Sequence, residues 1–337
     1  MTKKYNVAVV GATGVVGQEM LKVLEERNFP VGKIIPLASS RTAGSRVEFQ
    51  GQEVVVQELR AGSFQDVQLA LFSAGSAVSE KYAPLAARAG AVVIDNTAFF
   101  RMDPQVPLVV PEINAAAVHQ RPKGIIANPN CSTAQMVVAL KPIYDAAGIK
   151  RLVISTYQAV SGTGKEAIDE LEKEVLDILQ LKKVQPVVYP HQIAFNILPH
   201  IDDFLADGYT KEEMKMVNET KKIFGDDSIR ATATTCRVPV FYGHSECVNV
   251  ETRQKLTADE ARRLLRQAAN VVVLDEPQKN IYPMPILAAG KNETLVGRIR
   301  EDISVENGLE LFIVADNLRK GAAFNAVQIA EEVIKDY

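Results

Sequence analysis

The sequence predicts an α/β fold made of a doubly wound N-terminal dinucleotide-binding domain and a second, α+β domain. Three observations indicate this: glycines that follow the first strand, a series of short apolar runs within residues 1–130, and longer strands with separate helices after residue 131. A chain of 337 residues, 47% of them hydrophobic, is long enough to bury two cores.

The N-terminal half begins with an apolar run at residues 5–10, three glycines and then apolar residues at helical spacing. This order reads as strand, tight turn and helix. Further apolar runs, most of them continuous as in strands covered on both faces, lie at residues 34–38, 69–74, 92–96 and 125–127. We therefore expect a doubly wound sheet in the first 130 residues.

The second half has a different pattern, with expected helices at residues 132–147 and 165–180, a long strand at 151–160, and strands near Arg237, Cys247, Leu295 and Leu311. A last helix is expected at residues 317–335, packed back on the first domain. The predicted domains are residues 1–130 with 317–337 for the dinucleotide, and residues 131–316 for the substrate.

Charge and composition exclude several classes of protein. The net charge of −3 is spread along the chain, which gives no field to attract nucleic acid or an anionic membrane. No apolar run approaches the roughly 20 residues that span a bilayer, and the N-terminus leads directly into a strand. Cys131, Cys236 and Cys247 are too scattered for a disulfide framework. A cytoplasmic protein without nucleic-acid or membrane partners is expected.

The glycine pattern GATGVVG stands between the first strand and the first helix, where the dinucleotide fingerprint requires it. Gly11 permits the tight turn, Gly14 lets the backbone approach the pyrophosphate, and Gly17 lets helix and strand pack closely. A glycine triplet alone often marks only a turn, but this position favours a cofactor site. The predicted cofactor contacts here are Gly11, Thr13, Gly14, Val15, Val16 and Gly17.

The end of the second strand predicts the choice of cofactor. Ser39, Ser40, Arg41 and Thr42 stand where an NAD enzyme usually carries an acid for the ribose hydroxyls. A guanidinium and hydroxyls can instead donate to a 2′-phosphate, although a solvated polar loop is the common alternative. NADP is therefore the predicted cofactor.

Cys131 precedes an apolar helix and follows the polar residues Asn128 and Asn130. A helix N-terminus stabilises a thiolate, the form of cysteine that attacks carbonyl groups. A lone cysteine is more often a small buried apolar residue, but the polar neighbours and the terminal position favour a nucleophile.

Five phrases in order, GATGVVG, NPNCST, QAVSGTGKEA, RVPVFYGHSE and DNLRKGAA, resemble the aspartate-semialdehyde dehydrogenase family, and matching segments run from about residue 5 to 335. The resemblance implies that Cys131 is the acylated nucleophile, that Gln158 orients the substrate and that His244 is the acid/base. It places catalysis and dimerisation in the second domain. It also implies a homodimer, or a tetramer made of two such dimers.

The resemblance also implies the charged contacts of the substrate. Arg237 would grip the α-carboxylate, Glu212 the amine, and Lys215 and Arg101 the phosphate. Arg237 alone could instead belong to a surface salt bridge, and Glu212 and Lys215 to a solvated helix face. A capping box from Thr210 to Glu213 is expected to begin the helix that carries Glu212 and Lys215. The remaining cofactor contacts implied by the family are Ser161, Gly162 and Asn317.

Among the four histidines, His119, His191 and His200 lack a convincing catalytic partner in the sequence. A metal site made of Cys236, His244 and Cys247 is an alternative, but the paired close spacing of structural zinc sites is absent. A nucleophile, a proton carrier and an anchor for substrate charges are what acyl transfer with hydride transfer needs.

The reaction implied by the resemblance is NADPH-dependent conversion of β-aspartyl phosphate to aspartate β-semialdehyde and inorganic phosphate. It lies on the route to lysine and diaminopimelate, threonine, methionine and isoleucine. The rivals are N-acetyl-γ-glutamyl-phosphate reductase, glyceraldehyde-3-phosphate dehydrogenase and a non-catalytic relative with the same fold. The nucleophile phrases of the two rival enzymes differ from NPNCST. A non-catalytic relative is expected to lose the cysteine or the histidine, and both are present here.

Overall fold

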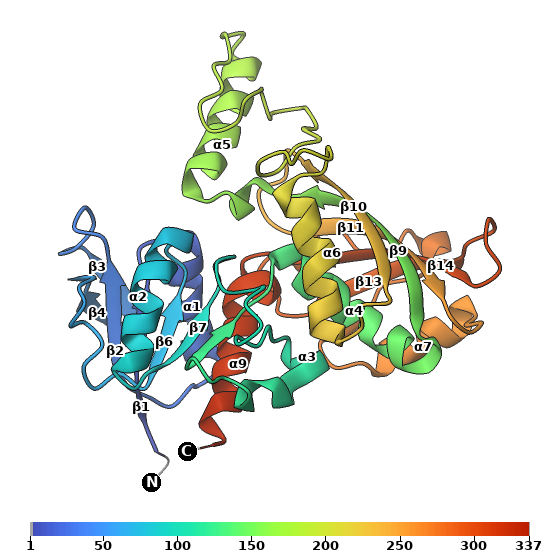
Figure 1. Cartoon of the computed structure of the whole chain (residues 1–337). Coiled ribbons are helices and arrows are strands. Elements are labelled where there is room, and N and C mark those ends of the chain that lie inside the picture. Colours follow the sequence, from blue (N-terminus) through green and yellow to red (C-terminus); the bar gives the residue numbers. More distant parts are fainter. Residues whose placement is uncertain (1–2, 337) are drawn as a thin grey trace. The chain divides into compact units, whose positions relative to one another are not determined.

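The computed structural model describes residues 3–336 and divides into two compact units, Met1–Asn130 with Ala322–Tyr337, and Cys131–Gly321 (Figure 1). We predicted the return to the first unit at residue 317, and the structure places it at Ala322 instead. The reason is that Asn317 bonds to Ser161 and to the amide of Gly243, both in the second unit.

The first unit contains a parallel six-stranded sheet in the order β5-β2-β1-β6-β7-β8. The order reverses at β1, so the chain is doubly wound as predicted, and sheets of this kind bind their ligands where the strand order reverses. The strands are β1 Tyr5–Val10, β2 Val31–Ala38, β5 Gln57–Glu58, β6 Leu69–Phe72, β7 Val92–Asp95 and β8 Ile125–Ala127.

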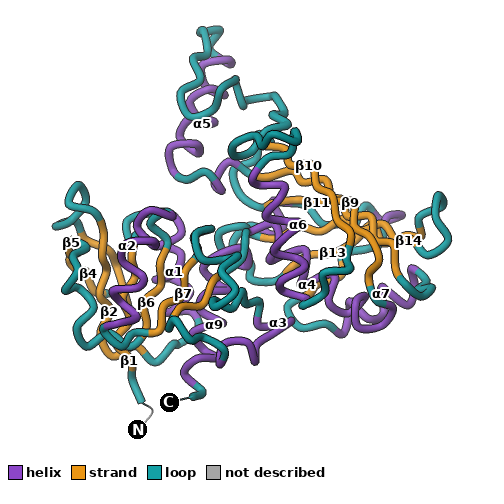
Figure 2. The backbone as a smooth tube through the Cα atoms, viewed as in Figure 1, coloured by secondary structure: helices purple, strands orange, loops and turns teal. Residues whose placement is uncertain are grey.

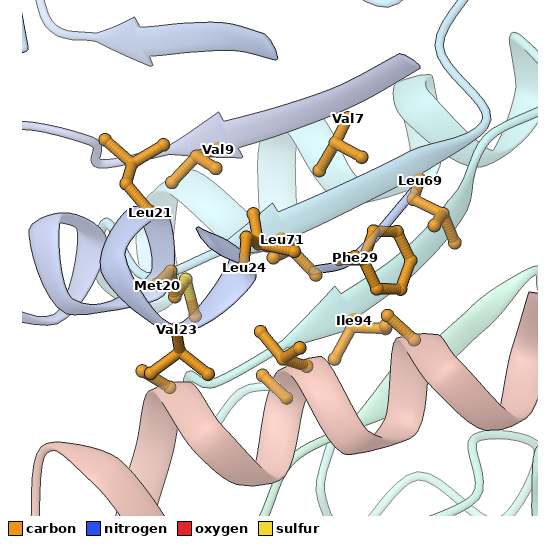
Figure 3. Packing of buried hydrophobic residues seen from close by; sticks show 14 of the residues in the cluster. Val7, Val9, Met20, Leu21, Val23, Leu24, Phe29, Leu69, Leu71 and Ile94 are labelled. Carbon is orange, nitrogen blue, oxygen red and sulfur yellow. The ribbon is translucent and has the colours of Figure 1, made fainter. Parts of the chain in front are cut away.

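Helices cover this sheet and complete its core. They are α1 Val15–Glu26, α2 Ser76–Arg88, α3 Pro111–Asn114 with the 3-10 turn Ala115–His119, and α9 Phe324–Ile334. Strand residues such as Val9 and Leu71 pack against Met20 and Leu24 of α1, with α9 as the pale red helix of Figure 3. The C-terminal helix thus packs on the first domain, as predicted, although a π-helical turn at Arg319–Ala323 precedes it. The hairpin β3 Arg46–Phe49 and β4 Gln52–Val55 was not predicted.

The second unit contains a mixed six-stranded sheet in the order β10-β9-β11-β14-β13-β12, which confirms the predicted α+β domain (Figure 2). Strand β10 is parallel to β9, and β11 is antiparallel to both β9 and β14. The strands are β9 Ile149–Gln158, β10 Arg230–Arg237, β11 His244–Thr252, β12 Val271–Val273, β13 Thr294–Glu301 and β14 Gly308–Ala315.

Strand β9 alternates between buried residues such as Ile154 and half-buried ones such as Ser155, so the sheet has one covered face. Helices of the second unit that contact the sheet are α4 Cys131–Ala147, α6 Lys211–Phe224, α7 Ala258–Gln267 and the short α8 Pro285–Ala288. Short 3-10 turns lie at Val160–Gly162 and Pro277–Lys279.

Helix α5, Lys165–Leu179, stands away from the sheet and has a small core of its own (Figure 1). Its buried carboxylates at Glu170 and Glu174 accept backbone N–H bonds from residues 187–189 and 193–194. The irregular loop after α5 is held by these bonds, because buried amides need an acceptor. Among residues 3–336, no helix is long and apolar enough to cross a bilayer.

Candidate active site

Cys131 is the first residue of α4 and is partly exposed, as the sequence predicts. Its thiol therefore lies where the amides at the start of the helix favour an anion. A Cβ added at Gly321 would lie 2.6 Å from the Cβ of Cys131, so the chain passes Cys131 with no room for a side chain. This close approach explains the glycine of the DNLRKGAA phrase.

His244 is the first residue of β11 and is completely buried. Its Nδ1 accepts a hydrogen bond from the amide of Ala159 at 3.0 Å. Burial lowers the pKa of His244 well below 6.5, and the nearby positive charge of Arg237 lowers it further. His244 is therefore a neutral imidazole in the folded chain at neutral pH.

The bond from Ala159 also determines where the proton of His244 lies. An amide N–H can only donate, so Nδ1 holds the lone pair and the neutral ring carries its proton on Nε2. Within the described residues Nε2 has no hydrogen-bond partner, and a Cβ at Gly162 would lie 3.2 Å from it. The absence of a side chain at Gly162 leaves this donor open to a substrate.

Arg237, the last residue of β10, lies beside the same glycine. Its Nη1 donates to the carbonyl of Ala159 at 2.8 Å and would lie 3.1 Å from a Cβ at Gly162. The guanidinium is buried, and its Nε has no partner among residues 3–336. Arg237 and His244 thus face one place, as predicted, and each has a buried donor without a partner among the described residues.

Gln158, Glu212 and Lys215 form a second polar group on β9 and α6. Glu212 accepts from Gln158 Nε2 at 3.2 Å and from Lys215 Nζ at 3.0 Å. The predicted capping box of Thr210 and Glu213 begins α6 and places Glu212 and Lys215 on one helical face.

Asp202 belongs to this group and was missed in the sequence. It accepts from Lys215 Nζ at 2.7 Å. Burial disfavours the charge of Lys215, but Glu212 and Asp202 outweigh burial and raise its pKa. Burial is likewise the largest single effect on Asp202 and opposes its charge, but the hydrogen bonds from Lys215 and from the amide of Asp203, together with the charge of Lys215, outweigh burial and lower the pKa of the carboxyl. Asp202 lies in an irregular loop 13 residues from its partner, so no periodicity identifies it.

Ser161 and Asn317 come together from distant parts of the second unit. Asn317 Nδ2 donates to Ser161 Oγ at 3.0 Å, and the amide of Gly243 donates to Asn317 Oδ1 at 3.0 Å. All three residues are buried. This places Ser161, Gly162 and Asn317 in one region next to His244, which directly follows Gly243.

The glycine loop of the first unit has the geometry of a dinucleotide turn. Gly11 has φ +88°, and a Cβ at Gly17 would lie 2.1 Å from the carbonyl oxygen of Gly11, so neither position accepts another residue without strain. Gly14 is the N-cap of α1, which has no side-chain cap. The backbone amides of the first turn of α1 are therefore not bonded to a capping side chain, as binding of a pyrophosphate would require.

The loop after β2 lies beside the glycine loop, because Thr42 Oγ1 is 3.3 Å from Thr13 Oγ1. Ser39, Ser40 and Arg41 are exposed there. In the same unit Arg101 is buried, and its guanidinium donates to the carbonyls of Asn128 at 2.9 Å and Asn96 at 2.6 Å. Backbone acceptors thus fix the orientation of Arg101.

Two segments of the chain match known domains. Residues 6–121 match the domain described as "Semialdehyde dehydrogenase, NAD binding domain", and residues 140–320 match "Semialdehyde dehydrogenase, dimerisation domain". Aspartate-semialdehyde dehydrogenase of Aquifex aeolicus is 56% identical over 335 residues, covering 98% of each chain. The chain belongs to the aspartate-semialdehyde dehydrogenase family.

Other members support this assignment over the whole length. The enzyme of Legionella pneumophila is 57% identical and covers 100% of this chain and 98% of its own. A crystal structure of aspartate semialdehyde dehydrogenase II from Vibrio cholerae complexed with ASA superposes with a TM-score of 0.97 at 51% identity, with 100% of both chains covered. The family predicted from the five phrases is confirmed.

The geometry disfavours the alternative metal site of Cys236, His244 and Cys247. Along β11, His244 points to the covered face of the sheet and Cys247 to the half-buried face, where Cys236 also lies. The three side chains therefore do not converge. Of the other histidines, His119 is exposed beside Asp336, His191 is exposed, and His200 stacks on Phe204.

The charge state of His244 can be tested directly. Because its folded pKa is lowered, the unfolded chain binds the proton more tightly, and this group reduces stability as the pH falls through about 6.5. We expect ¹⁵N NMR of labelled protein to show a neutral ring protonated on Nε2 at about pH 6.5, where an ordinary imidazole is half protonated. A histidine-containing peptide provides the reference, and a doubly protonated His244 at that pH would contradict the assignment.

Proposed function

We propose that this chain catalyses the NADPH-dependent reductive dephosphorylation of L-β-aspartyl phosphate to L-aspartate β-semialdehyde, through a thioester at Cys131. The observation that carries the proposal is the convergence of His244 Nε2 and Arg237 at Gly162, in the unit that begins with Cys131 at a helix N-terminus. The family membership supports the same reaction.

The first step uses Cys131. Its thiolate attacks the carbonyl carbon of the acyl phosphate, so a carbon–sulfur bond forms, the bond to the phosphate oxygen breaks and inorganic phosphate leaves. NADPH, when bound, supplies the hydride that reduces the thioester. The alkoxide formed at that carbon needs a donor, and His244 Nε2–H is the open one. The thiohemiacetal then collapses: the carbon–sulfur bond breaks, the hydroxyl proton returns to His244 Nε2, and the aldehyde and the thiolate of Cys131 are released.

The charged residues fix the substrate for this chemistry. Arg237 would bind the α-carboxylate with its unused donors. Glu212, oriented by Gln158 and Lys215, would accept from the α-amine. Lys215 and Arg101 would bind the phosphate. Together these groups distinguish an aminoacyl phosphate from a simple aldehyde, because each charge of the substrate has a fixed partner.

The first unit would hold the cofactor, with the pyrophosphate on the amides at the start of α1 and the 2′-phosphate on Ser39, Ser40 and Arg41. Ser161, Gly162 and Asn317 would contact the nicotinamide end. The related structure from Candida albicans, at 27% identity and a TM-score of 0.76, is described as containing NADP. In the cytoplasm the product would feed the synthesis of lysine, diaminopimelate, threonine, methionine and isoleucine.

We also propose that the half-buried face of the second sheet joins two copies of the chain in a homodimer. Ser155 and Cys247 are neighbours at the centre of this face, with Tyr157 and Phe312 beside them, and none is fully buried in the single chain. The match to a dimerisation domain supports the assignment. A tetramer would pair two such dimers through other surfaces.

The covalent mechanism predicts that Cys131→Ala reduces kcat to below about one thousandth of the wild-type value, since no other group can form the acyl-enzyme. Cofactor affinity should stay within about twofold, because the glycine loop is untouched. Activity is measured with aspartate semialdehyde, phosphate and NADP. Without phosphate, mass spectrometry of the wild type should detect an aspartyl adduct on Cys131. Cys236→Ser and Cys247→Ser are the controls and should remain active; substantial turnover in Cys131→Ala would refute the thioester.

The cofactor assignment predicts that Arg41→Ala weakens NADP binding by about tenfold or more, since a charge-assisted bond to an exposed phosphate is worth roughly 1.5 kcal/mol. NAD binding should barely change, because NAD has no phosphate there. Arg46→Ala provides a matched control on β3, where the exposed Arg46 pairs with Glu53. Parallel titrations with both cofactors measure the difference. Equal losses for NADP and NAD would mean that Arg41 stacks on the adenine instead.

The dimer assignment predicts that Ser155→Arg, a charge at the centre of the half-buried sheet face, converts the dimer to monomers. Sedimentation velocity at micromolar concentration measures the change. Ile303→Arg is the control, because Ile303 is 104% exposed in the loop between β13 and β14 and should leave the dimer intact. A Ser155→Arg protein that still sediments as a dimer would place the interface elsewhere.

A further inference from the structure

A buried acid beside the candidate site has no part in the chemistry described above. Glu246 lies two residues after His244 on β11, so both side chains point to the covered face of the sheet, and Glu246 is completely buried. Helix α4 contacts β11 on that face. Ser132 and Gln135 of α4 are likewise completely buried, and Ser132 directly follows the nucleophile.

Gln135 links the strand of His244 to the helix of Cys131. Its Nε2 donates to the carbonyl oxygen of His244 at 3.2 Å. The side chains of Ser132 and Gln135 also face the carboxyl of Glu246 and interact with it. Both contacts are loose, because neither carboxyl oxygen of Glu246 has a hydrogen bond of normal distance and angle within residues 3–336.

The surroundings of Glu246 determine its charge. Burial raises the pKa of the carboxyl well above its ordinary value, and the opposing effect of Ser132 and Gln135 is smaller. Among the described residues no cation contributes to the charge state of Glu246, which is influenced by burial, Ser132 and Gln135. Burying an ionised carboxylate without such a partner is very unfavourable, so the group is neutral in the folded chain.

A neutral carboxyl can do what a carboxylate cannot. It keeps one acceptor for Ser132 or the Gln135 amide and gains an O–H donor. Gln135 Oε1 is buried and has no hydrogen-bond partner in the described part of the chain. A protonated Glu246 offers the donor that this oxygen needs, whereas a carboxylate would repel it. The uncharged form also places no negative charge below the helix N-terminus that stabilises the thiolate.

We propose that Glu246 is a positioning residue, an uncharged hydrogen-bonding acid that joins the first two turns of α4 to β11 through Ser132 and Gln135. It thereby holds Cys131 and His244 in register without opposing ionisation of the thiol. The inference deepens the proposed function, and it rests on Cys131 being the nucleophile.

The test compares two variants of Glu246 with a control. Glu246→Met keeps the volume but removes the hydrogen bonds. Glu246→Gln keeps uncharged hydrogen-bonding groups and is the conservative rescue. Glu251→Gln is the matched control on the same strand, since Glu251 is partly exposed and pairs with Lys150 at the surface. The main readout is the pH dependence of iodoacetamide alkylation at Cys131, assigned by mass spectrometry.

Glu246→Met should slow alkylation of Cys131 at pH 7 by about tenfold and move its midpoint to higher pH, since the thiol leaves its place at the helix terminus. The value of kcat should fall by about tenfold or more, with KM for semialdehyde changed less than threefold. Glu246→Gln and Glu251→Gln should remain within about threefold of wild type in every readout. Unchanged protection of Cys236 and Cys247 against alkylation shows that the fold and the proposed dimer are intact.

Either of two results overturns the proposal. A folded Glu246→Gln protein with lost activity would mean that the carboxyl acts through its proton or charge, and a Glu246→Met protein with wild-type alkylation and kcat would mean that it positions nothing. If Glu246→Met does not fold, Gln135→Met removes the same link from the helix side and must give the same shift. Alkylation requires no substrate, so a wild-type protein inactive on aspartate semialdehyde would refute the proposed function while leaving this readout informative.

Discussion

The geometry of the site depends on the backbone of Ala159, at the turn after β9. Its amide donates to His244 and its carbonyl accepts from Arg237, so one buried peptide segment orients the two side chains that face Gly162. The sheet makes this possible: parallel pairing places Arg237 opposite Gln158, and antiparallel pairing brings the start of β11 next to the same end of β9. A shift of either register by one residue would turn these side chains to the other face. Formation of the sheet therefore assembles the site.

Burial explains which polar atoms are available to a substrate. The buried carboxylates of α5 are used on backbone amides, and Glu213 is used within the capping box and by the amide of Thr235, so these groups stabilise the fold. His244 Nε2 and Arg237 Nε are equally buried but have no partner in the described residues. Leaving such atoms unsatisfied costs stability, and a substrate oxygen would recover that cost on binding. Buried polar atoms that bond to the protein thus stabilise the fold, whereas buried polar atoms without such a partner are available to bind a substrate.

The sequence was informative where the determining contacts are local. The strand, glycine turn and helix at residues 5–26, the capping box at Thr210 and the position of Cys131 at the start of α4 all follow from spacing along the chain. Ala159, Asp202 and Glu246 could not be identified in this way. Their importance arises from partners between 13 and 114 residues away, which only the pairing of β9, β10 and β11 and the packing of α4 and α6 bring together. The domain boundary predicted at residue 317 lies at Ala322 for the same reason, since the side chain of Asn317 is hydrogen-bonded to the distant Ser161.

Two buried glutamates in the second unit illustrate how the surroundings assign a chemical role. Glu212 lies 3.0 Å from the ammonium of Lys215, which Asp202 shares, so this acid has a cation beside it. Among the described residues, Glu246 interacts with the hydroxyl of Ser132 and the amide of Gln135, and burial keeps it neutral beside α4. Exchanging the two environments would leave the ammonium of Lys215 without one of its acidic partners, and would place a cation where burial now favours an uncharged acid. The two glutamates differ in one neighbour. Lys215 lies three residues after Glu212 on the same helix and pairs with it, whereas no lysine contributes to the charge state of Glu246 among the described residues.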